Sequence, residues 1–216
     1  MSIPGNGAIY TAPVFDEEAL ITSLSQDGYF VLDNFLAPNH FAELRLRLID
    51  LWENDQFRRA GIGKMTNFQK DAEIRGDKVF WIEEEDAVLP VKAYLDLIES
   101  LRMTVKRGLF LPLRCFESHF AVYPPGSFYK RHRDNFNKLN HRLISVVLYL
   151  NENWKAEEGG ILRLYPEGKE VVDVEPIGSR LVIFRSDLEH EVLPCNAPRY
   201  SITGWMRDQP IGLSFL

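Results

Sequence analysis

Cysteine is scarce in this chain of 216 residues, and the two that occur, Cys115 and Cys195, form neither a Cys-x-x-Cys pair nor a disulfide framework. The first residues lack the basic segment and apolar run that a signal peptide needs. No apolar run is long enough to span a bilayer. We therefore expect a cytoplasmic protein with no membrane partner.

Basic charge is also in deficit, because 25 Lys and Arg residues stand against 31 Asp and Glu residues, which gives a net charge of −6. Non-specific binding to nucleic acid depends on clustered Lys and Arg, so this balance argues against a nucleic-acid partner. The hydrophobic content of 45% and the length are those of a soluble globular protein with a sizeable core.

The order of patterns predicts one domain over residues 1–216, with a helical support over about 1–110 and a β-rich core over about 115–210. Apolar residues at helical spacing predict helices at 15–27, from Pro38 to about Leu51, and at 87–108, with strands at 29–36 and 74–82. Short strands separated by Gly- and Pro-rich turns follow at 116–123, 129–133, 143–150, 160–165, 171–174, 180–184, 189–193 and 200–207. Eight strands in two sheets form a jelly roll. The expected fold is mainly β with N-terminal helices, a cupin-like double-stranded β-helix.

The segment YPPGSFYKRHRD at 123–134 carries the main candidate site. Side chains alternate along a strand, so His132 and Asp134 point to the same side and can meet one metal ion. Two histidines and one carboxylate with open positions are typical of non-haem Fe(II) oxygenases. A second histidine from elsewhere in the chain is needed to complete such a site. The alternative interpretation is a surface turn with a solvated ion pair.

His190 is the best second ligand, because a jelly roll can return its strand beside the strand that carries His132. His119 alternates with Phe120 and is expected to line the barrel interior rather than to bind metal. We expect His40 at the surface of a helix start and His141 in a solvated turn.

The segment RYSITGW at 199–205 begins nine residues after His190 and contains Arg199 and Ser201. A buried arginine needs an anion, and the planar guanidinium binds a carboxylate through two parallel hydrogen bonds. A surface arginine near a turn is the alternative. The three motifs in this order, His-x-Asp, then His, then Arg-x-Ser, occur together much more rarely than each occurs alone.

The segment at 58–76 has little periodicity, and its first part, 58–70, contains two glycines and four basic residues, which predicts a long mobile loop. Met65 and Phe68 would give it apolar contacts with a bound peptide, so we expect a substrate clamp. Arg75 and Asp77, at its exit, are expected to pair and to contribute to substrate binding.

Several segments taken together resemble a known family: IRGDKVFWIE at 74–83, HRDN at 132–135, YLN at 149–151, GGILR at 159–163, PEG at 166–168 and RYSITGW at 199–205. From about residue 74 to 207 the chain looks like the Fe(II)- and 2-oxoglutarate-dependent oxygenases. The likeness is to the prolyl 4-hydroxylase branch, and closest to bacterial relatives of the hypoxia-sensing prolyl hydroxylases. The segment between Tyr123 and His132 is one residue shorter than in the animal enzymes, which predicts a different substrate rim.

The resemblance implies a role for each matching residue. His132, Asp134 and His190 would bind Fe(II), and Arg199 would bind the C5 carboxylate of 2-oxoglutarate with the Tyr149 hydroxyl as its second contact. Further residues would line the cosubstrate and substrate sites: Tyr123, Tyr129, Ser201 and Trp205.

The activity implied is that of a 2-oxoglutarate-dependent dioxygenase that uses Fe(II), 2-oxoglutarate and O2, with ascorbate as a candidate reductant. The first interpretation is a prolyl 4-hydroxylase that acts on an exposed prolyl loop of a protein. Bacterial relatives are associated with translation, so elongation factor Tu is a candidate substrate. Hydroxylation of a free amino acid or another small molecule is an alternative. A cupin-like sensor that binds metal and ligand without turnover is another, against which the intact triad and Arg199 argue.

Overall fold

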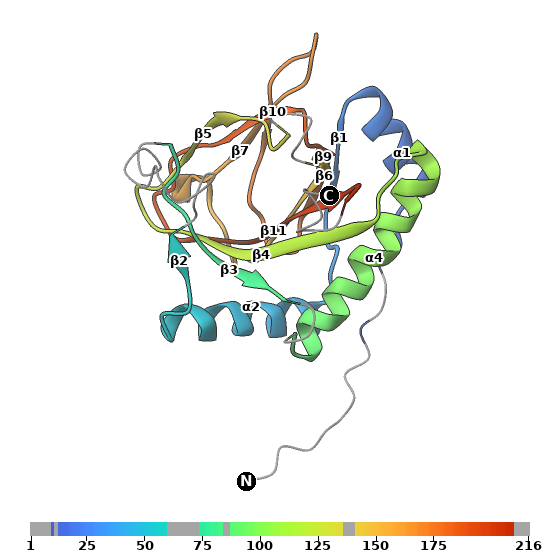
Figure 1. Cartoon of the computed structure of the whole chain (residues 1–216). Helices are drawn as coiled ribbons and strands as arrows, with labels where there is room; N and C mark the ends of the chain where they lie inside the picture. The colour runs from blue at the N-terminus through green and yellow to red at the C-terminus, as the bar shows by residue number, and fades with distance from the viewer. Residues whose placement is uncertain (1–9, 11–12, 60–73, 84–86, 136–140, 210–216) are drawn as a thin grey trace, which may run out of the picture.

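The computed structural model describes residues 10, 13–59, 74–83, 87–135 and 141–209. Within these residues, two antiparallel sheets face each other and helices cover the outer face of the larger one (Figure 1). None of the described helices is long and apolar enough to cross a membrane.

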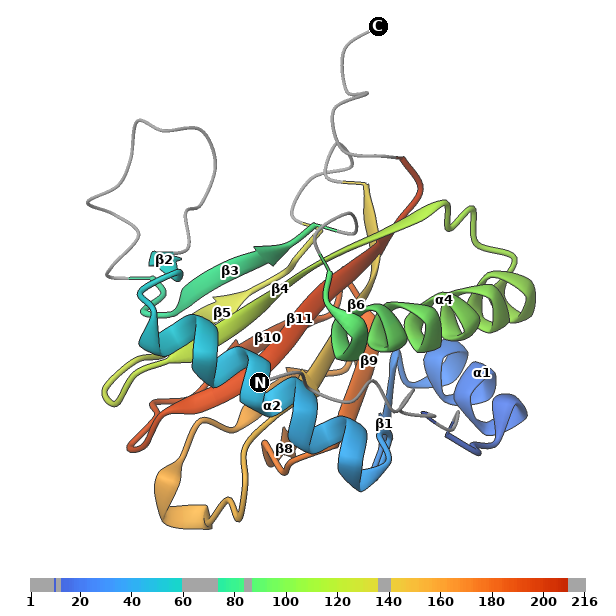
Figure 2. The ribbon, with the colours of Figure 1, turned by 90° about the horizontal axis from the view of Figure 1, so that it is seen from below.

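Three helices form the N-terminal support: α1 (Glu17–Gln26), α2 (Pro38–Glu53) and α4 (Leu89–Leu109). The Asp16 side chain caps α1 by accepting a hydrogen bond from the backbone N–H of Ala19. Pro38 opens α2, where its fixed φ and missing N–H are tolerated. Figure 2 shows these helices together on one side of the larger sheet.

The larger sheet has seven strands in the order β1-β9-β6-β11-β4-β3-β2. Their bounds are β1 (Tyr29–Leu32), β9 (Leu181–Arg185), β6 (Arg142–Tyr149), β11 (Arg199–Arg207), β4 (Cys115–Tyr123), β3 (Lys78–Ile82) and β2 (Arg58–Arg59). The smaller sheet has the order β5-β10-β7-β8, with bounds β5 (Tyr129–His132), β10 (Glu189–Val192), β7 (Leu162–Tyr165) and β8 (Val172–Val174). This arrangement is the predicted double-stranded β-helix.

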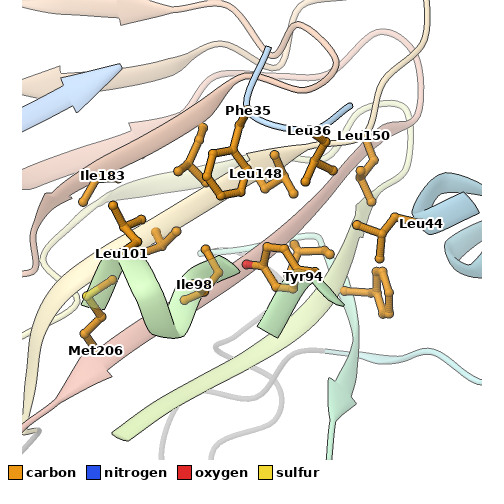
Figure 3. Packing of buried hydrophobic residues seen from close by; sticks show 14 of the residues in the cluster. Phe35, Leu36, Leu44, Tyr94, Ile98, Leu101, Leu148, Leu150, Ile183 and Met206 are labelled. Atoms are coloured by element: carbon orange, nitrogen blue, oxygen red, sulfur yellow. The ribbon is translucent and has the colours of Figure 1, made fainter. Parts of the chain in front are cut away.

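Strand alternation sorts the side chains of the larger sheet into two clusters. Phe120 and Val122 of β4 pack toward the helices, whereas Ala121 and Tyr123 pack toward the smaller sheet. The cluster on the helical side is drawn in Figure 3, where Tyr94 and Ile98 of α4 lie near the sheet. The helices therefore bury one face of the sheet and leave the other for the interior between the sheets.

The elements predicted from the sequence are largely confirmed. The observed bounds lie within two residues of the predicted ones for each strand predicted after residue 115 and for the helices predicted at 15–27 and 87–108. The predicted strands 29–36 and 74–82 are shorter, at Tyr29–Leu32 and Lys78–Ile82. The short strand β2 and the 3₁₀ turn Ala156–Glu158 were not predicted, because two or three residues carry no measurable period.

The expectation for His40 was wrong. Its side chain is buried, Nε2 lies 2.8 Å from the carbonyl oxygen of Pro90, and the tilted Tyr10 ring packs against it with centroids 4.1 Å apart. His141 is only half-buried, but Nδ1 lies 2.9 Å from Oδ1 of Asp208. Both histidines are held by residues distant in sequence, which a local pattern cannot reveal.

Candidate active site

The neighbouring strands β5 and β10 bring two histidines face to face. His132 and His190 are direct partners in the antiparallel register, and their ring centroids lie 4.2 Å apart. This is the return of the His190 strand beside His132 that the sequence predicted. Phe184 packs edge-on against His190, and Tyr129 stacks flat on His132 at a centroid distance of 3.6 Å.

Asp134 lies two residues after the end of β5 and turns its carboxylate toward both rings. Oδ1 lies 3.5 Å from Nε2 of His132, and Oδ2 lies 3.7 Å from Nε2 of His190. One ligand atom from each of the three residues lies within 4.8 Å of the others. The Ser145 hydroxyl on β6 donates to Oδ2 of Asp134 at 2.7 Å and lies 2.9 Å from Oγ of Ser186.

Both imidazoles are fixed in the form that ligates a metal. Nδ1 of His132 lies 2.7 Å from the Lys130 carbonyl oxygen, and Nδ1 of His190 lies 3.0 Å from that of Leu188. A carbonyl oxygen only accepts, so Nδ1 carries the proton and the lone pair of Nε2 points inward.

Burial lowers the pKa of His190 to about 4, which keeps its ring neutral at pH 7. Burial alone would raise the pKa of Asp134, but the adjacent imidazoles hold it well below its usual range, so the carboxylate is ionised. A neutral imidazole and an ionised carboxylate are the forms that bind a cation.

Arg199, at the start of β11, lines the same cavity. Its side chain is 4% exposed, Nε donates to the Gly160 carbonyl oxygen at 2.8 Å, and Nη1 donates to Oγ of Ser201 at 3.4 Å. Among the described residues, no carboxylate lies within ion-pair distance of this guanidinium. The remaining N–H groups can therefore take an anion.

Two tyrosine rings surround this guanidinium. Its central carbon lies 5.0 Å from the Tyr123 ring centroid and 4.8 Å from that of Tyr149. The Tyr149 hydroxyl is buried and has no hydrogen-bond partner by geometry, and burial raises its pKa more than the neighbouring Arg199 guanidinium lowers it, so the phenol keeps a proton to donate. Arg199 can only donate, so that proton awaits an acceptor from outside the protein.

A buried ion pair closes one side of the cavity. Arg75 Nε donates to Oδ1 of Asp77 at 2.6 Å, and Nη2 donates to Oδ2 at 2.5 Å. The Arg75 guanidinium lies 4.5 Å from the Tyr129 ring centroid, and the backbones of the two residues form an isolated antiparallel β-bridge. The predicted pairing of Arg75 with Asp77 is present, whereas the predicted loop contacts at Met65 and Phe68 lie outside the described residues.

Another part of the cavity lining is aromatic and polar. Trp205 lies six positions beyond Arg199 on β11, with its ring centroid 5.4 Å from that of His119 on β4. The Arg142 guanidinium lies 3.5 Å from the Trp205 ring centroid, and its Nε donates to Oε1 of Glu117 at 2.8 Å. His119 faces the interior, as the alternation on β4 predicted.

Comparison with known proteins gives a consistent result. Residues 118–207 match the model of the 2OG-Fe(II) oxygenase superfamily. The chain is 36% identical over 206 residues to the prolyl hydroxylase EGLN3 of Mus musculus, covering 88% of this chain and 83% of that protein. The chain belongs to the 2OG-Fe(II) oxygenase superfamily. It is thus a 2-oxoglutarate-dependent dioxygenase that requires Fe(II), 2-oxoglutarate and O2.

Solved structures of this superfamily match over most of the chain. A Pseudomonas putida prolyl-4-hydroxylase has a TM-score of 0.81 and 36% identity, and the match covers 90% of this chain and all of that chain. A Trichoplax adhaerens prolyl hydroxylase, in complex with a peptide fragment of the hypoxia inducible factor oxygen degradation domain, has a TM-score of 0.80 and 31% identity. That match covers 89% of each chain.

The described residues fit the groups that an oxygenase of this superfamily needs. Nε2 of His132 is buried without a hydrogen-bond partner, as expected for an atom reserved for a metal. His132, His190 and Asp134 line the space between the sheets, and Tyr149, whose O–H has no partner, packs in the cluster on the same side of the larger sheet. The donor set of two imidazoles and one carboxylate suits Fe(II).

Sequence reasoning missed three residues of this site: Ser145, which holds Asp134, and the pair of Arg142 with Glu117. Ser145 and Glu117 both lie opposite Trp205 in the sheet register. Alternation along 143–150 could have placed Ser145 on the inner face with Tyr149, but nothing local in the sequence identifies its partner.

Proposed function

We propose that the protein is a prolyl 4-hydroxylase that acts on a prolyl residue of a protein substrate. The observation that carries the proposal is the likeness, at 36% identity over most of both chains, to enzymes named as prolyl hydroxylases. The cavity supports it, because His132, Asp134, His190 and Arg199 all line one space.

In this proposal His132, Asp134 and His190 would hold Fe(II) through one ligand atom each. The iron, when bound, supplies the chemistry that activates O2. The chain keeps the ligands in place through the two Nδ1–carbonyl hydrogen bonds and through the Ser145 hydroxyl on Asp134. Such supporting contacts typically change metal affinity by about 10- to 100-fold when removed.

Arg199 and Tyr149 bind the distal carboxylate of 2-oxoglutarate in this proposal. The N–H groups of Arg199 that Gly160 and Ser201 leave free, and the Tyr149 O–H, are donors without a counterpart in the protein. Tyr123 packs beside the guanidinium and closes the pocket. Ascorbate as a reductant stays a prediction.

The charges of the cavity favour a prolyl residue within a chain over a free amino acid. Arg75 is paired with Asp77, and Arg142 is paired with Glu117. With Asp134 assigned to iron and Arg199 to 2-oxoglutarate, no charged group of the described lining remains for a free carboxylate or ammonium. Tyr129, beside the Arg75–Asp77 pair, then forms one wall of the substrate site.

Elongation factor Tu is the candidate substrate that the bacterial resemblance suggests. The test measures succinate release by the enzyme loaded with Fe(II) and 2-oxoglutarate, with elongation factor Tu, with free L-proline, or with neither. We expect stimulation by the protein and a mass increase of one oxygen on one of its prolines. Stimulation by free L-proline alone would instead support the small-molecule alternative.

A further inference from the structure

Four buried polar atoms on the inner face of the larger sheet and on β5 lack a hydrogen-bond partner. They are His132 Nε2, Tyr149 Oη, His119 Nδ1 and Trp205 Nε1. The first two are accounted for by iron and 2-oxoglutarate. A buried donor or acceptor left unpaired destabilises the folded protein, so the remaining pair calls for an explanation.

The two unexplained nitrogens belong to neighbouring, tightly held rings. His119 is 3% and Trp205 is 6% exposed, and both line the cavity that contains the triad. Trp81 packs edge-on against His119 at a centroid distance of 4.8 Å, and Arg142 covers Trp205. Because these neighbours hold both rings, the two nitrogens keep fixed positions in the wall of the cavity.

The chemistry of the pair is that of a neutral hydrogen-bond donor site. The indole N–H of Trp205 can only donate. Burial lowers the pKa of His119 to about 3, so the ring is neutral and carries one N–H. In the tautomer with the proton on Nδ1, the nitrogen without a partner is a donor. Neither group offers a charge to a free carboxylate or ammonium.

A prolyl residue within a chain offers the matching chemistry. Its nitrogen has no hydrogen, so the polar atoms near its ring are the carbonyl oxygens of the peptide bonds on either side, which only accept. We propose that His119 and Trp205 together donate to one such carbonyl oxygen, which makes His119 a specificity-determining residue of the substrate site. The inference rests on the proposed function, because it assumes that the substrate is an amide-flanked proline.

The test uses the full-length enzyme loaded with Mn(II), which replaces Fe(II) without turnover, and with 2-oxoglutarate. The probes are N-acetyl-L-proline N′-methylamide, which has both carbonyl oxygens and no charge, and free L-proline. Paramagnetic broadening of probe proton signals by Mn(II) reports binding near the metal and gives a dissociation constant. The variants are His119→Leu, His119→Asn and Trp205→Phe, because the Asn amide places a donor near the position of Nδ1. His40→Leu is the matched control, since His40 is also buried with a partnerless Nδ1 but does not line the cavity.

We expect wild-type enzyme and His40→Leu to bind the capped proline alike, and His119→Leu and Trp205→Phe to bind it about tenfold more weakly. His119→Asn should recover most of the loss, which a purely structural role of the ring would not allow. Unchanged affinity in His119→Leu, or no binding of the capped proline to the wild type, would overturn the inference.

The same probes separate this inference from the proposed function. Binding of free L-proline as tight as that of the capped probe would count against a protein substrate and also against the carbonyl site. A different result would remove only the inference. In that case the substitutions of His119 and Trp205 do not change the affinity for the capped probe, but the enzyme still hydroxylates a prolyl residue of a protein, so the proposed function stays intact.

Discussion

Replacing Tyr149 with Phe should move protein stability and cosubstrate affinity in opposite directions. The Tyr149 ring is fully buried beside Arg199, and its O–H has no acceptor. Removing the hydroxyl should leave the ligand-free protein as stable as before, or more stable by about 1–3 kcal/mol, because an unpaired polar group disappears. A gain of 1 kcal/mol corresponds to a rise in Tm of about 2–4 °C for a chain of this size.

The affinity for 2-oxoglutarate should fall in the same variant. One hydrogen bond to a charged carboxylate contributes about 1.5–3 kcal/mol, which corresponds to a dissociation constant weaker by about 10- to 150-fold. Titration calorimetry on the Mn(II)-loaded enzyme measures the affinity, and thermal unfolding of the metal-free protein measures the stability.

Tyr94 offers a matched control for this experiment. Its hydroxyl is also buried without a partner, but it lies in the helical cluster of Figure 3, away from Arg199. Tyr94→Phe should therefore share the effect on stability and leave the affinity for 2-oxoglutarate unchanged. Equal affinities in Tyr149→Phe and the wild type would refute the assignment of Tyr149 to the cosubstrate.

Other substitutions test the remaining parts of the site. His190→Ala should abolish Fe(II) binding in equilibrium dialysis, and wild-type affinity would exclude His190 as a ligand. Arg199→Ala should weaken 2-oxoglutarate about a hundredfold while iron still binds, because a bidentate charge-assisted contact is lost. Ser145→Ala should weaken Fe(II) about tenfold or more, since Asp134 loses a 2.7 Å hydrogen bond; a result equal to wild type would remove Ser145 from the site. The buried His119 has a folded pKa of about 3, below its unfolded value near 6.5, so the unfolded chain binds the extra proton. The contribution of His119 to the stability of the metal-free wild type should thus fall by up to about 1.4 kcal/mol per pH unit below about pH 6.5, in addition to the losses from other buried histidines, so His119→Leu should show a shallower loss in urea titrations.

Much of the β core could be predicted because its signals are local. Pairs of Gly and Pro separate the short strands, and period-two alternation put His132 and Asp134 on one side. The place of His190 followed from topology, since a jelly roll returns that strand beside β5. These inferences need only the sequence of one or two segments and a known fold.

The contacts that the sequence did not reveal depend on register between distant strands. The Glu117 carboxylate accepts from Arg142 at 2.8 Å and from Arg207 at 2.7 Å, across three strands of the larger sheet. Likewise, His40 is buried through the Pro90 carbonyl on another helix. A shift of one residue in register would reverse every such side chain, and the register is set by the whole sheet.

The central claim, prolyl hydroxylation driven by 2-oxoglutarate, is tested most directly with ¹⁸O₂. The enzyme is reconstituted anaerobically with Fe(II) and 2-oxoglutarate, mixed with elongation factor Tu, and exposed to ¹⁸O₂ before peptide mass spectrometry. A prolyl residue that gains one ¹⁸O atom, with a second ¹⁸O in succinate, is the predicted result. Two results together would contradict the account. Elongation factor Tu does not stimulate succinate formation, and no labelled proline is found in elongation factor Tu or in a proteome-wide digest treated in the same way.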